Sequence, residues 1–178
     1  MRPKGLVTIS KITLADGTEL PTWKAIEYGW IAKPEGKQPT GWGLERHEVP
    51  LGENLFVDQG RQIVAYAFGF RAPVQNYVCA NFGVGTGTTA AKVTDVALEA
   101  PITLSNSLTT KAVDTIDFLS PFTVRVGFTL SVNDANGYII SEQGLFSGGN
   151  ALICRKIRSV SINKTSDFAS TLTWRIRF

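Results

Sequence analysis

Few side chains in this sequence could take part in catalysis, and they form no complete catalytic motif. His47 is the only histidine, and its surroundings, LERHEVP, lack the second histidine of the zinc-binding H-E-x-x-H motif. A Ser-His-Asp or Cys-His site would have to recruit His47 from an irregular segment, where catalytic geometry is hard to maintain. Two cysteines and one histidine cannot build a typical zinc site alone. We therefore expect no enzymatic activity, no metal and no other cofactor.

The most distinctive local pattern is the glycine- and threonine-rich stretch NFGVGTGTTAAKVTDVALEAPI. A phosphate-binding P-loop ends in Gly-Lys-Ser/Thr, but here Gly87 is followed by threonine and Lys92 comes too late. Gly85 and Gly87 fit the start of a dinucleotide-binding pattern, but the downstream strands have antiparallel rather than parallel character. We expect a tight turn, followed by one short helical turn capped by Thr94 or Asp95.

Acidic residues offer one further candidate site. Four carboxylates are close in sequence, and helix capping and solvation explain them: Asp95, Glu99, Asp114 and Asp117. Glu142 differs, because alternation from Tyr138 and Ile140 places it on the apolar face of a strand. A buried carboxylate needs a partner, and Arg155 or Lys156 across the next hairpin is the natural candidate. We predict a structural Glu142–Arg155 ion pair rather than a catalytic acid.

Alternation of apolar and polar residues predicts the strands that must position these side chains. Apolar residues occupy the even positions of 122–130 and of 171–178, while threonine, arginine and glycine occupy the odd positions. This pattern gives a strand one buried and one solvated face, as in antiparallel sheets. Two more strands are expected at 137–146 and 151–160, entered through the turns NDANG and SGGN. We predict that the four strands form an antiparallel meander, half of a sandwich or jelly roll.

Earlier parts of the chain give weaker patterns. Strands are predicted at 5–14, at 77–82 and within 101–118. Asp58 can cap the only convincing helix, at 58–70, where apolar residues recur at helical spacing. The predicted fold is therefore mainly β, an antiparallel β-sandwich or jelly-roll-like domain with one short helix.

Residues 1–54 are predicted to form an extended N-terminal arm, and residues 55–178 the β-domain. In the second half of the arm the periodic patterns fade, and three tryptophans lie among prolines and glycines: Trp23, Trp30 and Trp42. Disordered segments are poor in aromatic residues, and large aromatic side chains pack on some surface. The tryptophans therefore mark either an interface with a partner molecule or a loop that packs within the domain.

Composition limits the remaining possibilities. A length of 178 residues, 43% hydrophobic and 19% charged, is typical of one soluble globular domain. We expect no transmembrane helix and no secretory signal, because no apolar run is long enough and no signal core is present. The net charge of +3 is too small to predict a nucleic-acid partner. Cys79 and Cys154 lie in apolar stretches and are expected to be buried, reduced thiols.

Three stretches, taken in order, carry a resemblance to a known group of proteins. They are NFGVGTGTTAAKVTDVALEAPI, DANGYIISEQGLFSGGNALICRKI and INKTSDFASTLTWRIRF. They resemble structural proteins of tailed bacteriophages, in which a glycine-threonine motif, an E-x-G-L-F hairpin and a terminal W-x-I-x-F strand recur in this order. The resemblance covers residues 55–178. Such proteins look like non-enzymatic β-domains that pack in rings or lattices.

The resemblance implies a virion structural protein, assembled in the host bacterial cytoplasm. The leading expectation is a capsid cement or decoration protein, a homo-oligomer that bridges subunits of the major capsid protein or other virion proteins. A neck, baseplate or tail-fibre component of the same particle is the close alternative. A carbohydrate- or receptor-binding module is a second alternative, in which the tryptophans would stack on sugar rings. No membrane partner is expected.

Overall fold

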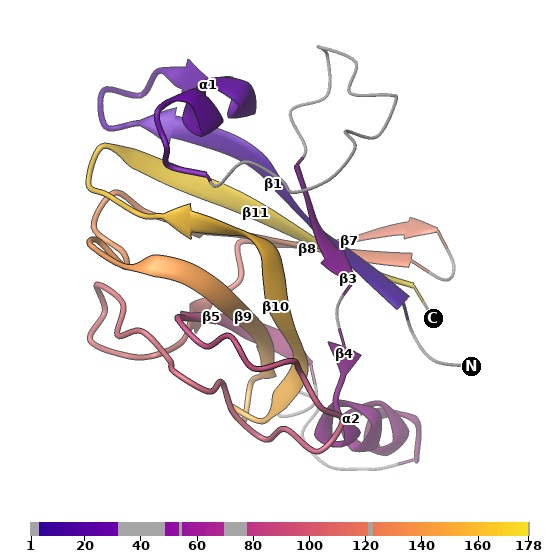
Figure 1. Ribbon diagram of the computed structural model, residues 1–178. Coiled ribbons are helices and arrows are strands. Elements are labelled where there is room, and N and C mark those ends of the chain that lie inside the picture. Colours follow the sequence, from indigo (N-terminus) through magenta and orange to yellow (C-terminus); the bar gives the residue numbers. More distant parts are fainter. Residues whose placement is uncertain (1–3, 32–48, 54, 70–77, 121–122, 178) are drawn as a thin grey trace.

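The computed structural model shows two antiparallel β-sheets packed face to face, with two helices at the periphery (Figure 1). It describes residues 4–31, 49–53, 55–69, 78–120 and 123–177. The predicted mainly β fold, an antiparallel sandwich, is confirmed.

The first sheet contains β1 (Lys4–Leu14), β2 (Glu19–Leu20), β3 (Val49–Glu53), β7 (Thr115–Ser120), β8 (Thr123–Leu130) and β11 (Phe168–Arg177). Its strand order is β2-β1-β11-β8-β7, and β3 also pairs with β1. The second sheet contains β4 (Leu55–Phe56), β5 (Cys79–Gly85), β6 (Lys111–Ala112), β9 (Ile139–Ser147) and β10 (Leu152–Asn163). Its order is β4-β10-β9-β5-β6. The helices are α1 (Thr22–Glu27) and α2 (Asp58–Gly69), and α2 packs beside β10.

The core lies between the two sheets and follows the alternation of the sequence. On β8 the buried apolar side chains are Val126, Phe128 and Leu130, and on β11 Trp174 is fully buried on the same inner face. The ring of Phe128 stacks on that of Phe82 from β5, with the ring centroids 4.3 Å apart. This aromatic contact joins the two sheets at the centre of the sandwich.

The predicted four-stranded meander is wrong, although its four strands exist. β8 pairs with β11 and β7, whereas β9 pairs with β10 and β5. The chain therefore crosses between the sheets after β8 and again after β10. The turn at Asn136–Gly137, where Gly137 has a φ of +81°, lies in the first of these crossovers rather than in a hairpin. Local turn patterns fix where a strand ends, but not which strand it pairs with.

The predicted extended arm at 1–54 is also wrong for the described part of that range. β1 forms a long antiparallel ladder with β11, from Lys4↔Arg177 to Leu14↔Phe168. Ile12 and Ile31 are buried in the common core, so these residues belong to the same domain as 55–178. Without β1, β11 would expose a long row of unpaired backbone groups, which explains why this segment folds back on the sheet. Residues 32–48 lie outside the described residues.

Helix α2 confirms the helix predicted at 58–70, but α1 was not predicted. α1 has only six residues, too few for a hydrophobic period to be visible. It packs Ala25 into the core, and the backbone just after it joins the end of β10 through the Ile31↔Ile162 bridge. Neither described helix has the length and apolar character needed to cross a membrane.

The two cysteines form no disulfide, as predicted. Cys154 is fully buried on β10, whereas Cys79 at the start of β5 is only half-buried. Burial raises the pKa of the Cys79 thiol to about 12, so this group stays protonated and unreactive at neutral pH.

Substituting Ile12 tests whether the N-terminal segment is part of the core. Ile12→Ala should lower the free energy of unfolding by about 2–5 kcal/mol, because it leaves a cavity in the core between the two sheets. Urea denaturation measures this difference. Leu108→Ala is the control, because Leu108 is exposed and its loss should cost less than about 0.5 kcal/mol. Equal, small effects at both positions would restore the arm interpretation.

Candidate functional site

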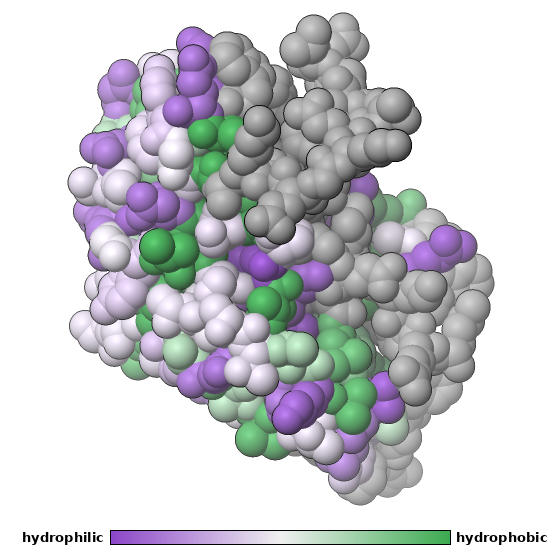
Figure 2. Space-filling view, viewed as in Figure 1, coloured by the Kyte–Doolittle hydropathy of each residue, from purple (hydrophilic) through white to green (hydrophobic). Residues whose placement is uncertain are grey.

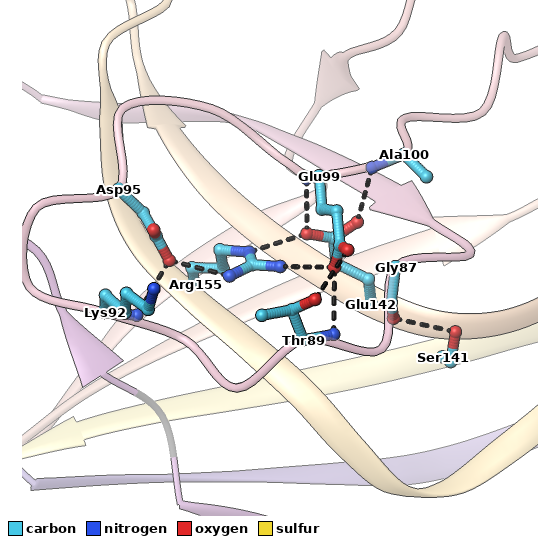
Figure 3. A network of polar contacts seen from close by, with 9 residues as sticks. All are labelled: Gly87, Thr89, Lys92, Asp95, Glu99, Ala100, Ser141, Glu142 and Arg155. Carbon is cyan, nitrogen blue, oxygen red and sulfur yellow. Dashed lines mark hydrogen bonds and ion pairs between the residues drawn. The ribbon is translucent and has the colours of Figure 1, made fainter.

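A buried arginine with three carboxylates forms the most highly connected polar site of the described residues (Figure 3). Arg155 on β10 donates from Nε to Glu142 Oε1 at 2.6 Å. Its Nη1 donates to Asp95 Oδ2 at 2.7 Å and its Nη2 to Glu99 Oε2 at 3.2 Å. All three guanidinium nitrogens are therefore engaged. The predicted Glu142–Arg155 ion pair is present, and two carboxylates that the sequence assigned to capping join it.

Glu142 lies at the buried centre of this site. Its side chain has no exposed surface, and besides Arg155 it accepts hydrogen bonds from the backbone amides of Glu99 at 2.7 Å and Ala100 at 3.1 Å. These donors compensate the buried carboxylate for its loss of contact with water. Its lone pairs are occupied by the protein, so the geometry supports a structural role for Glu142.

The glycines of the GVGTG stretch make room for this carboxylate. A Cβ atom on Gly85 or on Gly87 would lie 2.5 Å from Glu142 Oε2, and that oxygen is held by a backbone amide. The Gly87 carbonyl accepts a hydrogen bond from the Ser141 hydroxyl at 2.9 Å. The glycine pattern is thus explained by close approach to a buried charge rather than by a phosphate.

The loop between Thr86 and Ala100 is fixed by the other two carboxylates. Glu99 accepts hydrogen bonds from the amide and hydroxyl of Thr89, at 2.9 and 2.6 Å. Asp95 accepts one from the Lys92 amide at 2.8 Å, so it closes a turn. The predicted helical turn after Asp95 is absent from this loop.

Hydrogen bonds and the arginine keep both loop carboxylates ionised. The two Thr89 hydrogen bonds are the main cause of the lowered pKa of Glu99, and Arg155 adds to it. Partial burial acts to raise the pKa of Asp95, but the Lys92 amide and the Arg155 guanidinium outweigh it and hold that pKa below its usual value.

The fixed loop covers a small apolar cluster on the outer face of the second sheet. The cluster consists of Val57, Leu98, Phe146 and Leu152. The loop also accepts a hydrogen bond at the Val93 carbonyl from the amide of Asp58, where α2 begins, at 2.7 Å. The ion network therefore holds together β9, β10, the loop and the start of α2.

A shallow depression of about 180 Å³ lies beside the network. It is lined by Thr89, Ala90, Lys92, Asp95, Ala97, Glu99 and Arg155. The carboxylates that line it are those already bound to the arginine. Within the described ranges, no group of three or more histidine, cysteine, aspartate or glutamate side chains is arranged to hold a metal ion.

A second feature is an exposed apolar edge on β7, the last strand of the first sheet. Phe118 is 81% exposed, and Leu119 and Ile116 are 47% and 43% exposed. On the face opposite Ile116 and Phe118, Asp117 pairs with Arg125 of β8 at 2.8 Å. The β7–β8 ribbon projects beyond the second sheet in Figure 1, and Figure 2 shows hydrophobic surface in that position. We call Ile116, Phe118 and Leu119 the β7 apolar edge.

The tryptophans predicted to contact a partner are placed only in part. Trp30 is half-buried, and its ring stacks on that of Phe168 with the centroids 4.7 Å apart. Its main contact is thus within its own chain. Trp23 lies in α1, but only its backbone is described. Trp42 and His47 lie outside the described residues.

The sequence analysis missed the β7 apolar edge. The available pattern was the alternation of Ile116 and Phe118 with Thr115 and Asp117, which predicted a weak strand. Alternation identifies the apolar face of a strand, but not whether another sheet covers it.

Comparison with known proteins adds no assignment: no family model, curated protein or solved structure matches this chain.

Two matched substitutions separate the buried ion pair from an exposed one. Glu142→Gln should lower the free energy of unfolding by about 3 kcal/mol or more, because the buried Arg155 loses a partner and the amide group meets backbone donors. Asp117→Asn breaks the exposed pair with Arg125 and should cost less than about 1 kcal/mol. Urea denaturation at neutral pH measures both. Similar losses would show that burial does not set the strength of the network.

Acid should weaken the network through Asp95. Its pKa in the folded protein is below the unfolded value of 3.8, so its contribution is complete above that value and is lost as the pH falls through the lower, folded pKa. The stability difference between the wild-type protein and Asp95→Asn should therefore shrink as the pH is lowered below about 4. Denaturation curves over a pH series measure this difference. A constant difference down to the lowest pH would contradict the prediction.

Proposed function

We propose that this chain is a non-enzymatic structural protein of a tailed-bacteriophage particle, and specifically a capsid cement or decoration protein. Two features support the proposal. The order of the glycine-threonine, E-x-G-L-F and W-x-I-x-F stretches resembles that of such virion proteins. The β7 apolar edge offers a surface through which the domain can bind neighbouring subunits.

The single observation that carries the proposal is the exposure of Phe118. A phenylalanine that is 81% exposed on an edge strand is unfavourable in an isolated soluble domain. Edge strands are usually protected by lysine, proline or a covering segment, and 115–120 contains neither lysine nor proline. Aromatic side chains are frequent anchors of protein interfaces, so a neighbouring protein is the natural cover.

The resemblance motifs themselves support the scaffold rather than the contact surface. Gly85 and Gly87 accommodate Glu142, Leu145 is fully buried in the core, and Trp174 fills its centre. The proposed contact surface is therefore the β7 apolar edge, which lies outside these motifs. The domain would bind between subunits of the major capsid protein or other virion proteins. Within the virion it would form a homo-oligomer.

Two alternatives follow from the same surface. A neck, baseplate or tail-fibre component would use the β7 apolar edge in the same way against a different neighbour. A carbohydrate- or receptor-binding module would need bare tryptophan rings, and the stacking of Trp30 on Phe168 disfavours that use of Trp30.

Binding to preformed shells tests the proposal. The wild-type protein should sediment with expanded capsids and raise their rupture temperature, whereas Phe118→Asp should lose at least about tenfold in affinity, equivalent to 1.4 kcal/mol, while keeping its own unfolding temperature. Leu108→Asp is the matched control, because it adds the same charge at an exposed leucine outside β7.

Absence of wild-type binding to shells would remove the cement assignment. Copurification with tails from capsid-defective lysates would instead assign the chain to the tail. Unchanged shell binding by Phe118→Asp would show that β7 is not the contact surface.

A further inference from the structure

A fully buried lysine lies at the second crossover between the sheets, directly after β10. Lys164 has no exposed surface, yet its ammonium group forms no ion pair with any described residue. Nζ donates to Asn136 Oδ1 at 3.1 Å and to the Thr165 carbonyl at 2.6 Å, and it lies 5.0 Å from the centre of the Phe168 ring. The Lys164 side chain is therefore removed from water, and its ammonium group contacts the side-chain amide of Asn136.

Asn136 lies in the first crossover, between β8 and β9. Its Nδ2 donates to the Val132 carbonyl at 2.8 Å, so the orientation of the side-chain amide is fixed at both ends. The Asn136 residue as a whole is exposed, whereas Lys164 is buried. A group released from Nδ2 can therefore leave into water.

Backbone hydrogen bonds join the two crossovers at this point. The amide of Gly137 donates to the Lys164 carbonyl at 2.9 Å, and the amide of Lys164 donates to the Tyr138 carbonyl at 3.0 Å. These bonds fix the lysine and asparagine side chains in facing positions. Holding a nucleophile beside the group it attacks, as the 3.1 Å contact between Nζ and Asn136 Oδ1 does here, avoids much of the entropy cost of bringing them together.

The buried carboxylate of Asp134 fixes the asparagine's turn from the other side. It accepts hydrogen bonds from the Ser131 amide and hydroxyl at 2.8 and 2.7 Å, from the Ser105 hydroxyl at 2.6 Å and from Lys111 at 2.8 Å. Asp134 is therefore a positioning residue, bound to partners other than Lys164.

Lys164 is also activated as a nucleophile. Burial lowers its pKa to about 8, although the negative charges of Asp134 and Asp167 act in the opposite direction. A large fraction of the amine is thus neutral in mildly alkaline solution. Desolvation of this kind is a known way to make a lysine reactive near neutral pH.

We propose that Lys164 and Asn136 form an intramolecular isopeptide bond. The ammonium first releases one proton to solvent, and the neutral Nζ attacks Cγ of Asn136. A bond forms between Nζ and Cγ, and the bond between Cγ and Nδ2 breaks. A second proton moves from Nζ to the departing nitrogen, which leaves as ammonia. No oxidant, metal or further reactant is required.

The bond would join the two crossovers between the sheets covalently. It would close a loop that contains β9 and β10, two central strands of the second sheet. Cross-linking of this kind reduces the freedom of the unfolded chain and so resists unfolding. The inference rests on the contacts of Lys164 and holds whether or not the chain is a virion protein.

Intact-mass measurement of the full chain tests the proposal. After incubation at about pH 9, above the lysine pKa, the mass should be lower by that of one ammonia, and the loss should be slower at about pH 6. A tryptic digest should contain the peptides of Asn136 and Lys164 joined together, with no cleavage after Lys164. Lys164→Met and Asn136→Ser should keep the full mass, whereas the exposed-site control Lys92→Met should still lose ammonia.

Because Asn136→Ser changes an exposed residue, it tests the chemistry even if Lys164→Met fails to fold. Full mass in the wild-type protein at about pH 9, with normal cleavage after Lys164, would overturn the proposal. So would ammonia loss that persists in Lys164→Met, or a product of lower mass that hydroxylamine cleaves after Asn136. That result would assign the loss to a succinimide at Asn136–Gly137.

Discussion

The arrangement of the second sheet and its covering loop depends on the ion network around Arg155. One guanidinium binds carboxylates from β9 and from two points of the loop between Thr86 and Ala100, so it joins segments that are far apart in sequence. Buried charges are unfavourable unless they are paired and hydrogen-bonded, and here each is. The loop that the network holds in place covers the outer face of the second sheet, where Leu98 and Phe146 would otherwise contact water. Gly85 at the end of β5 and Gly87 in the loop are required because a side chain would occupy the space of the Glu142 carboxylate.

The sequence predicted this site in part, and the limit has a physical origin. Glu142 could be identified because its position in a strand places a charge on a buried face. Arg155 could be identified because it lies across the adjacent hairpin. Asp95 and Glu99 lie 60 and 56 residues from Arg155 along the chain, and no local pattern connects them to it. Their roles as ligands of the arginine follow only from the tertiary structure.

The same distinction separates the correct and the wrong parts of the fold prediction. Alternation depends on which face of a strand is buried, so it predicted β8 and β11 and the fully buried Trp174. Strand pairing depends on long-range contacts, so the four-stranded meander was wrong. The N-terminal segment was predicted as an arm because its pairing partner, β11, is at the other end of the sequence. The six residues of α1 were too few to show a helical period.

The pairing of β1 with β11 determines how the domain would respond to a pulling force. Lys4 lies opposite Arg177, so the two ends of the described chain emerge at the same end of one antiparallel ladder (Figure 1). A load applied through these two ends would separate the strands one hydrogen bond at a time, as a zipper opens, rather than shearing the ladder all at once. Tension would be better resisted if it entered through side-chain surfaces. The domain is therefore suited to carrying load through contacts on its sides, and poorly suited to carrying load through its two chain ends.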